Sequence, residues 1–272
     1  MPHSGGRKQM TEIDYTESFD SDEYEKKVKE KEKAKNAEPI PVLEANEGKS
    51  AILEKGGAKY ERLPIRTHVI TEKDDICEVA EKYAKPHLIP DDILFVSEKA
   101  VACSQGRAIP LDDIKPRRLA VFLSKHVTKT KHGIGLGIPE TMEMALRECG
   151  TLRILFAAFI SVIGKLFKQK GWFYIIAGRK AASIDGPTSG TIPPYNKCVV
   201  LGPDRPDRVA VAISERLGCR CIIVDINDLG GNVLGVSDST LSRESLASLL
   251  ADNPLGQGHQ STPMGIIRAI AD

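Results

Sequence analysis

The chain contains 272 residues, of which 38 are Lys or Arg and 37 are Asp or Glu, so its formal net charge is only +1 at pH 7. A chain of this length buries enough apolar surface on folding to be stable without disulfides. The even balance of charge argues against nucleic acid as the main ligand, because a phosphate backbone requires a concentrated positive surface.

The sequence predicts a cytoplasmic protein. Met1 to Gln9 lacks the apolar core of a signal peptide. The most apolar run, Ile154 to Phe167, is about fourteen residues long, which is shorter than the roughly twenty that a membrane-spanning helix needs. We therefore expect a buried core helix in this run and no membrane partner. The 6 cysteines include no Cys-x-x-Cys pair, which is typical of reduced thiols in the cytosol.

The first 58 residues differ in composition from the rest of the chain. Glu23 to Lys35 alternates acidic and basic residues and has no apolar face to bury. Glu38 to Gly57 contains two prolines and ends on a pair of glycines, as expected of a linker. We predict a charged arm over residues 1–58, either disordered or a frayed helix, and a globular domain over residues 59–272.

From Tyr60 onward, hydrophobic periodicity predicts alternating strands and helices. Helices are expected over Asp75 to Ala84, Pro139 to Arg147, Asp207 to Leu217 and Ser242 to Leu250. Strands are expected over Thr67 to Thr71, Ile93 to Val96, Leu119 to Leu123, Trp172 to Ile176, Val199 to Leu201, Arg220 to Asp225 and Met264 to Ile270. The alternation predicts the α/β class with a mixed sheet.

Two polar segments follow apolar stretches, where α/β proteins commonly place functional residues. Lys99 and Arg107 come after the strand expected at Ile93 to Val96, and either side chain can hold phosphate or carboxylate. Ordinary surface charges are the simpler explanation of this pair. Asp185 enters a turn rich in Gly, Pro, Ser and Thr. Its carboxylate suits Mg²⁺ or Mn²⁺. The alternative is an Asp that only accepts hydrogen bonds from the amides of the turn.

Two further segments are polar. Asp225, Asn227 and Asp228 follow the most apolar strand. Adjacent carboxylates repel each other by roughly 4 kcal/mol at about 4 Å and an effective dielectric near 20, so either solvent or a cation must offset the repulsion. A metal site and a plain strand-to-turn connection both fit. Gly256 and Gln257 lie in a glycine-rich loop that either exposes backbone amides to a phosphate or is simply flexible.

Six segments, taken in this order, resemble the coenzyme F(420)-0:gamma-glutamyl ligase family. They are Leu63 to Thr67, Asp91 to Arg107, Ala182 to Asp185, Leu201 to Asp207, Asp225 to Gly230, and Gly256–Gln257 with Pro263 and Arg268 downstream. No single motif is highly specific, but six motifs in the correct order over about 200 residues are.

The resemblance implies a fold and a reaction. The fold is a mixed-sheet α/β fold with α+β character, built from two intertwined subdomains that form a homodimer. In the reaction, a carboxylate attacks the γ-phosphate of GTP in the presence of Mg²⁺ or Mn²⁺, and the amine of L-glutamate captures the acyl phosphate. The product carries glutamate on a deazaflavin cofactor precursor. The protein would mainly position these ligands and neutralise their charge.

The resemblance also assigns roles to residues. The implied metal ligands are Asp185, Asp225 and Asp228. The implied nucleotide-binding residues are Leu63, Pro64, Ile65, Lys99, Arg107, Thr188, Asn227, Gly256 and Gln257.

The sequence departs from the family pattern at several positions. Ala102–Cys103 stands where the family has a Ser–Lys pair, which removes a charged phosphate contact worth about 1.5 to 3 kcal/mol. Thr188 stands where the family has Asn, and the family's Asp-Thr-Phe-Gly turn fits either Asp225 or Asn227–Asp228. Three interpretations stay open: a GTP-dependent gamma-glutamyl ligase, a related ligase with a different acceptor, and a non-catalytic protein that binds nucleotide and metal.

Overall fold

The computed structural model describes residues 42–127, 134–167, 169, 171–188, 191–227, 230–256 and 260–270. The chain divides into a unit of residues Met1–Pro41 and a unit of residues Val42–Asp272. The charged arm predicted at the N-terminus lies outside the described residues as far as residue 41, so it stays a prediction.

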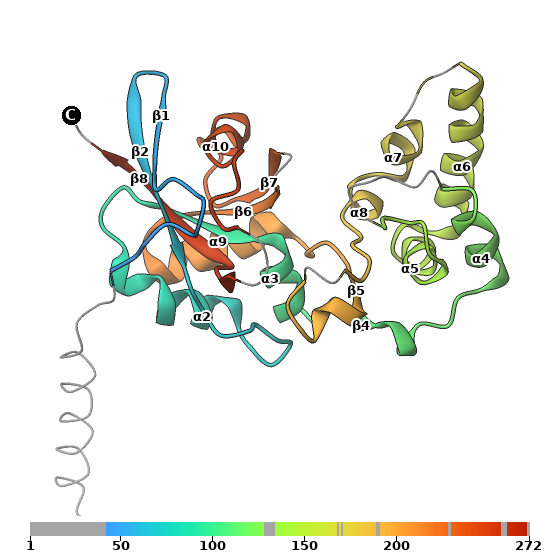
Figure 1. Ribbon diagram of the computed structural model, residues 1–272, viewed down its shortest axis with the longest axis horizontal. Helices are drawn as coiled ribbons and strands as arrows, with labels where there is room; N and C mark the ends of the chain where they lie inside the picture. Colours follow the sequence, from blue (N-terminus) through green and yellow to red (C-terminus); the bar gives the residue numbers. More distant parts are fainter. Residues whose placement is uncertain are drawn as a thin grey trace, which may run out of the picture. The chain divides into compact units, whose positions relative to one another are not determined.

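The second unit contains a six-stranded mixed sheet with the order β1-β2-β8-β3-β6-β7 (Figure 1). Its strands are β1 (Ile52–Lys55), β2 (Ala58–Ile65), β3 (Ile93–Ser97), β6 (Arg220–Asn227), β7 (Gly230–Val236) and β8 (Met264–Ile270). β3 pairs with β6 in parallel, whereas the other neighbouring strands are antiparallel. The predicted mixed sheet is confirmed, as are the strands expected at residues 93–96, 220–225 and 264–270.

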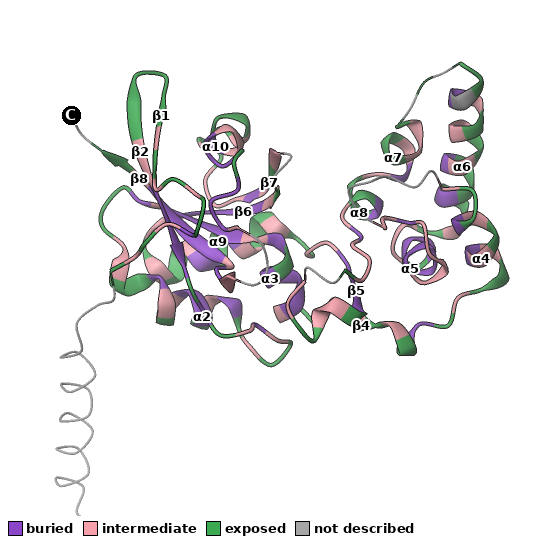
Figure 2. Ribbon diagram, viewed as in Figure 1, coloured by how far each residue is buried: buried purple, intermediate pink, exposed green. Residues whose placement is uncertain are grey.

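Helices cover both faces of this sheet, which explains the continuous apolar run in β6. On one face, α2 (Ile76–Tyr83), α3 (Glu98–Ser104) and α9 (Pro206–Leu217) pack with Cys221 and Ile223. On the other face, α10 (Arg243–Leu249) packs with Ile222 and Val224. Successive side chains of a strand point to opposite faces, so a strand covered on both sides needs an apolar residue at every position. Figure 2 shows these central strands as buried.

The ends of the helices follow local capping rules. The side chain of Asp75 caps α2 by accepting a hydrogen bond from the Cys77 amide at 2.7 Å. Pro206 begins α9, and Gly218 ends it in the left-handed conformation with φ of 72°. Ser242 caps α10 by accepting from the Ser245 amide. The helices expected at residues 75–84, 207–217 and 242–250 are confirmed.

The described residues between positions 114 and 184 form a helical region with a core of its own (Figure 1). It contains α4 (Arg118–Ser124), α5 (Pro139–Cys149), α6 (Thr151–Leu166), α7 (Trp172–Ala177) and α8 (Arg179–Ala182). A short antiparallel sheet of β4 (Ala108–Pro110) and β5 (Cys198–Val200) adjoins it, because Val199 of β5 belongs to the same core. The helix expected from Pro139 and the strand expected near residues 199–201 are confirmed.

Three expected strands are not strands. Residues 119–123 lie within α4 and residues 172–176 lie within α7. Both are short apolar runs, and such a run does not by itself distinguish a helix from a strand. Residues 67–71 form an irregular segment after β2. That segment ends in a turn in which the Asp74 carboxylate accepts hydrogen bonds from the amide and hydroxyl of Thr71.

Helix α6 differs from the buried core helix that its composition predicts. Ile154 and Ala157 are buried in the helical region, whereas Phe156 and Phe159 are exposed on the opposite side of the helix. Composition determines how many apolar residues a helix carries. It does not determine whether another element of the protein covers them.

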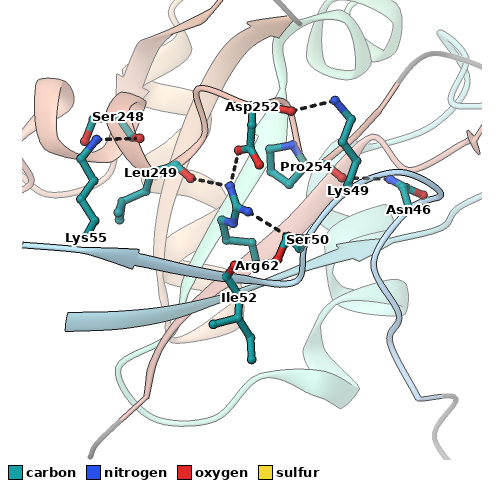
Figure 3. A network of polar contacts seen from close by, with 10 residues as sticks. All are labelled: Asn46, Lys49, Ser50, Ile52, Lys55, Arg62, Ser248, Leu249, Asp252 and Pro254. Atoms are coloured by element: carbon teal, nitrogen blue, oxygen red, sulfur yellow. Dashed lines mark hydrogen bonds and ion pairs between the residues drawn. The ribbon is translucent and has the colours of Figure 1, made fainter. Parts of the chain in front are cut away.

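The segment expected as a linker contributes to the sheet. Within it, β1 pairs with β2 through a tight turn at Gly56 and Gly57, both of which have positive φ. Arg62 of β2 is only 1% exposed. Its guanidinium donates to the Ser50 carbonyl at 2.8 Å and the Leu249 carbonyl at 3.1 Å and pairs with Asp252 (Figure 3). These contacts fasten the hairpin to the end of α10, because a buried charge is costly unless it is paired.

Candidate functional site

A pocket with a volume of about 630 Å³ lies where β3 and β6 end. Its walls come from residues 67–70, the start of α3, residues between 182 and 192, the end of β6, and the turns before β8. Six of the predicted site residues line it: Lys99, Asp185, Thr188, Asp225, Asn227 and Gly256. The structure therefore gathers residues that are far apart in the sequence.

The parallel pairing of β3 with β6 explains how two of these segments meet. Ser97 of β3 is opposite Val224 of β6 in the register. Glu98 follows Ser97 and Asp225 follows Val224. Because the two strands are parallel, both residues lie at the same edge of the sheet. The carboxyl ends of parallel strands are the usual position of ligand sites in α/β sheets.

Lys99 and Asp185 form an ion pair in the pocket. The Lys99 Nζ lies 2.9 Å from Asp185 Oδ2, and both side chains are about half exposed. The backbone of Asp185 is held by Val200, to whose carbonyl it donates at 2.8 Å and from whose amide it accepts at 3.0 Å. Burial opposes the charge on Lys99, but the Asp185 carboxylate outweighs this effect and the pKa of Lys99 is raised. Lys99 is therefore a permanent cation at this position.

Glu98 is a pocket residue that the sequence analysis missed. Its side chain lies in the protein interior with the residue 6% exposed, and its Oε2 has no hydrogen-bond partner among the described residues. Burial, followed by the charges of Asp225 and Asp185, raises the pKa of Glu98 well above its usual range. Perturbed carboxyl groups in pockets are markers of functional sites. The sequence does contain a signal for Glu98, because it is an acidic residue directly after the last residue of β3.

The pocket concentrates negative charge. Burial and the neighbouring Asp185 carboxylate raise the pKa of Asp225. A nearby cation favours the ionised form of such a carboxylate. Lys99 supplies one positive charge to this group, through its pairing with Asp185.

The donor set fits a hard divalent cation that is shared with a ligand. Within the described ranges, no three His, Cys, Asp or Glu side chains are close enough to enclose a metal ion. Asp228, the third implied ligand, lies outside the described residues. Mg²⁺ typically takes one or two protein carboxylates and completes its shell with water and substrate phosphates. The oxygen atoms of Asp185 and Asp225 suit that mode of binding.

Neutral polar groups surround the charged ones. The hydroxyls of Thr188 and Thr191 lie 2.9 Å apart. Gly256 has a φ of 69°, and its carbonyl accepts a hydrogen bond from Asn253 Nδ2 at 2.9 Å. Gln257, predicted to bind nucleotide beside Gly256, lies outside the described residues.

Four predicted nucleotide-binding residues do not line this pocket. Leu63, Pro64 and Ile65 are buried in β2 and pair with β8. Arg107 follows α3 and donates to the Gly202 carbonyl at 2.6 Å, and it pairs with Glu148 at 2.9 Å. In the described structure, these contacts tie Arg107 to the helical region.

Cys103 lines the pocket at a position where the resembled family has Lys. Burial raises the pKa of its thiol to about 11. The thiol is therefore neutral at pH 7 and does not replace the positive charge of a lysine. The adjacent Ala102 is fully buried and adds no polar group.

The fold and the pocket together define an α/β protein with a charged site for small polar ligands at the ends of two parallel strands. Residues 64–242 match the family model for F420-0:Gamma-glutamyl ligase, and the chain belongs to this family of ligases. The resemblance inferred from the six motifs is thereby confirmed. Comparison with curated proteins found no match. Of the helices in the described part of the chain, none has the length and apolar character required to span a membrane.

Proposed function

We propose that the protein is a GTP- and divalent-metal-dependent gamma-glutamyl ligase that forms an amide bond through an acyl phosphate. The observation that carries this proposal is the meeting of Asp185, Asp225 and Lys99 in one pocket. The family match supports the same reaction class. The proposed substrates are L-glutamate and a deazaflavin cofactor precursor with a free carboxylate.

The proposed roles follow from charge. Asp185 and Asp225, with Asp228, would hold Mg²⁺ or Mn²⁺, which when bound would neutralise phosphate oxygens. Lys99 would face the transferred phosphoryl group, because its ammonium lies 2.9 Å from the Asp185 carboxylate. In the first step, a substrate carboxylate oxygen bonds to the γ-phosphorus while the bond to GDP breaks. In the second step, the glutamate nitrogen loses a proton to solvent and bonds to the acyl carbon while phosphate leaves. The protein contributes positioning and charge neutralisation to both steps.

Calorimetry and phosphate release test this proposal together. We expect heat on titration with GTP or GDP only when Mg²⁺ or Mn²⁺ is present, and phosphate release only when glutamate and the acceptor are both added. The absence of nucleotide binding with either metal would contradict the proposal.

A related ligase with a different acceptor is the second candidate. The neutral Cys103 beside the pocket favours it, because the loss of a cation changes which anionic substrate the site accepts. A screen of carboxylate acceptors, with phosphate release as the readout, separates the two candidates. Nucleotide binding without phosphate release from any acceptor would indicate instead a non-catalytic protein.

We further propose that the protein acts as a homodimer in the cytoplasm. The dimer is implied by the resemblance, and light scattering on the purified protein tests it. The cytoplasmic location is proposed from the sequence, whose cysteines form no Cys-x-x-Cys pair.

A further inference from the structure

The outward side of α6 is an apolar surface, here called the outer face. Exposed side chains recur along it every third or fourth residue: Leu152, Phe156, Phe159, Val162 and Leu166. These five residues are between 55% and 84% exposed. Ile154 and Ala157 are buried in the core of the helical region. A monomeric protein rarely exposes a contiguous apolar surface of this kind unless the surface binds something.

Helix α7 lies next to α6 and extends the exposed apolar surface of the helical region. Ile175 of α7 is 73% exposed. Trp172, at the start of α7, lies against Gly164 of α6. It is the single tryptophan of the chain. Phenylalanine and leucine, which are exposed on α6, are typical of helices that lie in the headgroup layer of a bilayer.

The helical region is also strongly basic. Residues 114–184 contain thirteen Lys and Arg and only three Asp and Glu, although the whole chain has a net charge of +1. Two of the three acidic residues are each shared by two cations. Glu143 pairs with Arg117 and Arg147, and Glu148 pairs with Arg107 and Lys180. The positive charge of this region therefore has little internal compensation.

The charge selects among the partners that an apolar face could have. The region carries thirteen cations and three acids, so two copies that met through it would bring together surfaces of the same net charge. A nucleic acid would use the cations but would leave the phenylalanines uncovered. An anionic lipid surface matches both features, because its headgroups attract Lys and Arg and its acyl boundary covers the apolar face.

We propose that the helical region docks on anionic membranes, with the outer face of α6 lying in the interface parallel to the bilayer. At 16 residues α6 is too short to cross a bilayer, which agrees with an interfacial position. This proposal does not depend on the proposed reaction.

Vesicle binding tests the proposal on the full chain. We expect sedimentation with phosphatidylcholine–phosphatidylglycerol vesicles and not with phosphatidylcholine alone, and reversal of this binding by salt. Equal binding to both vesicles, or binding to neither, would overturn it. Tighter binding to oligonucleotides than to anionic vesicles would overturn it in favour of a nucleic-acid partner.

Matched variants locate the surface. Phe156→Glu combined with Phe159→Glu should weaken vesicle partitioning by about tenfold or more, since each phenylalanine would lose its transfer into an apolar layer. Ile52→Glu combined with Ile89→Glu introduces the same charges at residues that are 51% exposed outside the helical region, and it should leave partitioning unchanged. Phe159→Ser provides a milder variant whose helix content is checked by circular dichroism. If the double phenylalanine variant left lipid binding intact but changed the oligomeric state in light scattering, the face would bind a second copy instead.

Discussion

The Lys99 ammonium lies 2.9 Å from the Asp185 carboxylate, and this contact links the first turn of α3 to a segment that follows α8. The pair lies at the same pocket as Asp225 and the buried Glu98. Asp185 raises the pKa of both Glu98 and Asp225, Asp225 also raises that of Glu98, and Lys99 opposes both rises. The balance of charge in the pocket therefore depends on which cations occupy it.

Replacing Asp185 should separate function from folding. Asp185→Asn keeps the size of the side chain but removes its charge, and we expect metal-dependent turnover to fall by about 100-fold or more. The melting temperature should change little, because a half-exposed ion pair contributes about 0 to 1 kcal/mol. Asp112→Asn, at an exposed aspartate that does not line the pocket, is the control. Turnover by Asp185→Asn at the wild-type rate would exclude its role.

Neutralising Glu98 should stabilise the metal-free protein at neutral pH. The pKa of Glu98 is raised in the folded state by burial first and then by Asp225 and Asp185. The same carboxyl group ionises near pH 4.3 in the unfolded chain, so above that pH its ionisation favours the unfolded state. Glu98→Gln should therefore increase the free energy of unfolding at pH 7, and the gain should disappear as the pH falls toward about 4.

Urea unfolding between pH 4 and pH 7, in a chelator, measures this difference. Glu47→Gln, at an exposed position, should leave stability unchanged at every pH. A loss of stability in Glu98→Gln at pH 7 would show that the carboxylate is favourable where it lies.

Acid should weaken a turn beside the pocket. Hydrogen bonds from the Thr71 amide, then contacts with His68 and the Thr71 hydroxyl, lower the pKa of Asp74 to about 2. A carboxyl group whose pKa is lowered by folding adds stability above its pKa in the unfolded chain, which is near 3.9. That contribution is lost as the pH falls through its pKa in the folded state. The stability difference between wild type and Asp74→Ala should thus be constant above about pH 5 and shrink below about pH 4. A difference that persisted unchanged at pH 2.5 in thermal unfolding would contradict this assignment.

Arg62 should be essential for the stability of the hairpin. Arg62→Met leaves two carbonyls and the half-exposed Asp252 without their donor, and each buried acceptor left unpaired costs about 1 to 3 kcal/mol. Thermal unfolding measures the loss. Arg66→Met, at an exposed arginine four residues later, should change stability by less than about 0.5 kcal/mol. Equal effects of both substitutions would argue against the network in Figure 3.

The Cys103 thiol should be slow to react. Its pKa of about 11 leaves only about one molecule in a thousand as thiolate at pH 8. Mass spectrometry after brief iodoacetamide treatment should find this residue unmodified in the folded protein and fully modified in urea. Rapid native labelling would indicate a reactive thiol and a different chemistry for the pocket.

The sequence by itself determined the features that depend on neighbouring residues. The apolar run before Asp225 predicted β6, and Gly218 predicted the end of α9, because capping and continuous burial are local signals. The order of six motifs predicted the family, which the match over residues 64–242 confirmed. The convergence of Asp185 with Asp225 followed from the resemblance, and the structure places both in one pocket.

Tertiary structure decided the features that depend on which surfaces meet. Residues 119–123 and 172–176 became helices because they pack one side only against the helical region. Glu98 is perturbed because the fold buries it beside two aspartates, and Arg107 has Glu148 as its partner although 41 residues separate them. The phenylalanines of α6 are exposed because no element of the described chain covers them. Burial and long-range pairing are properties of two surfaces in contact, so no single stretch of sequence contains them.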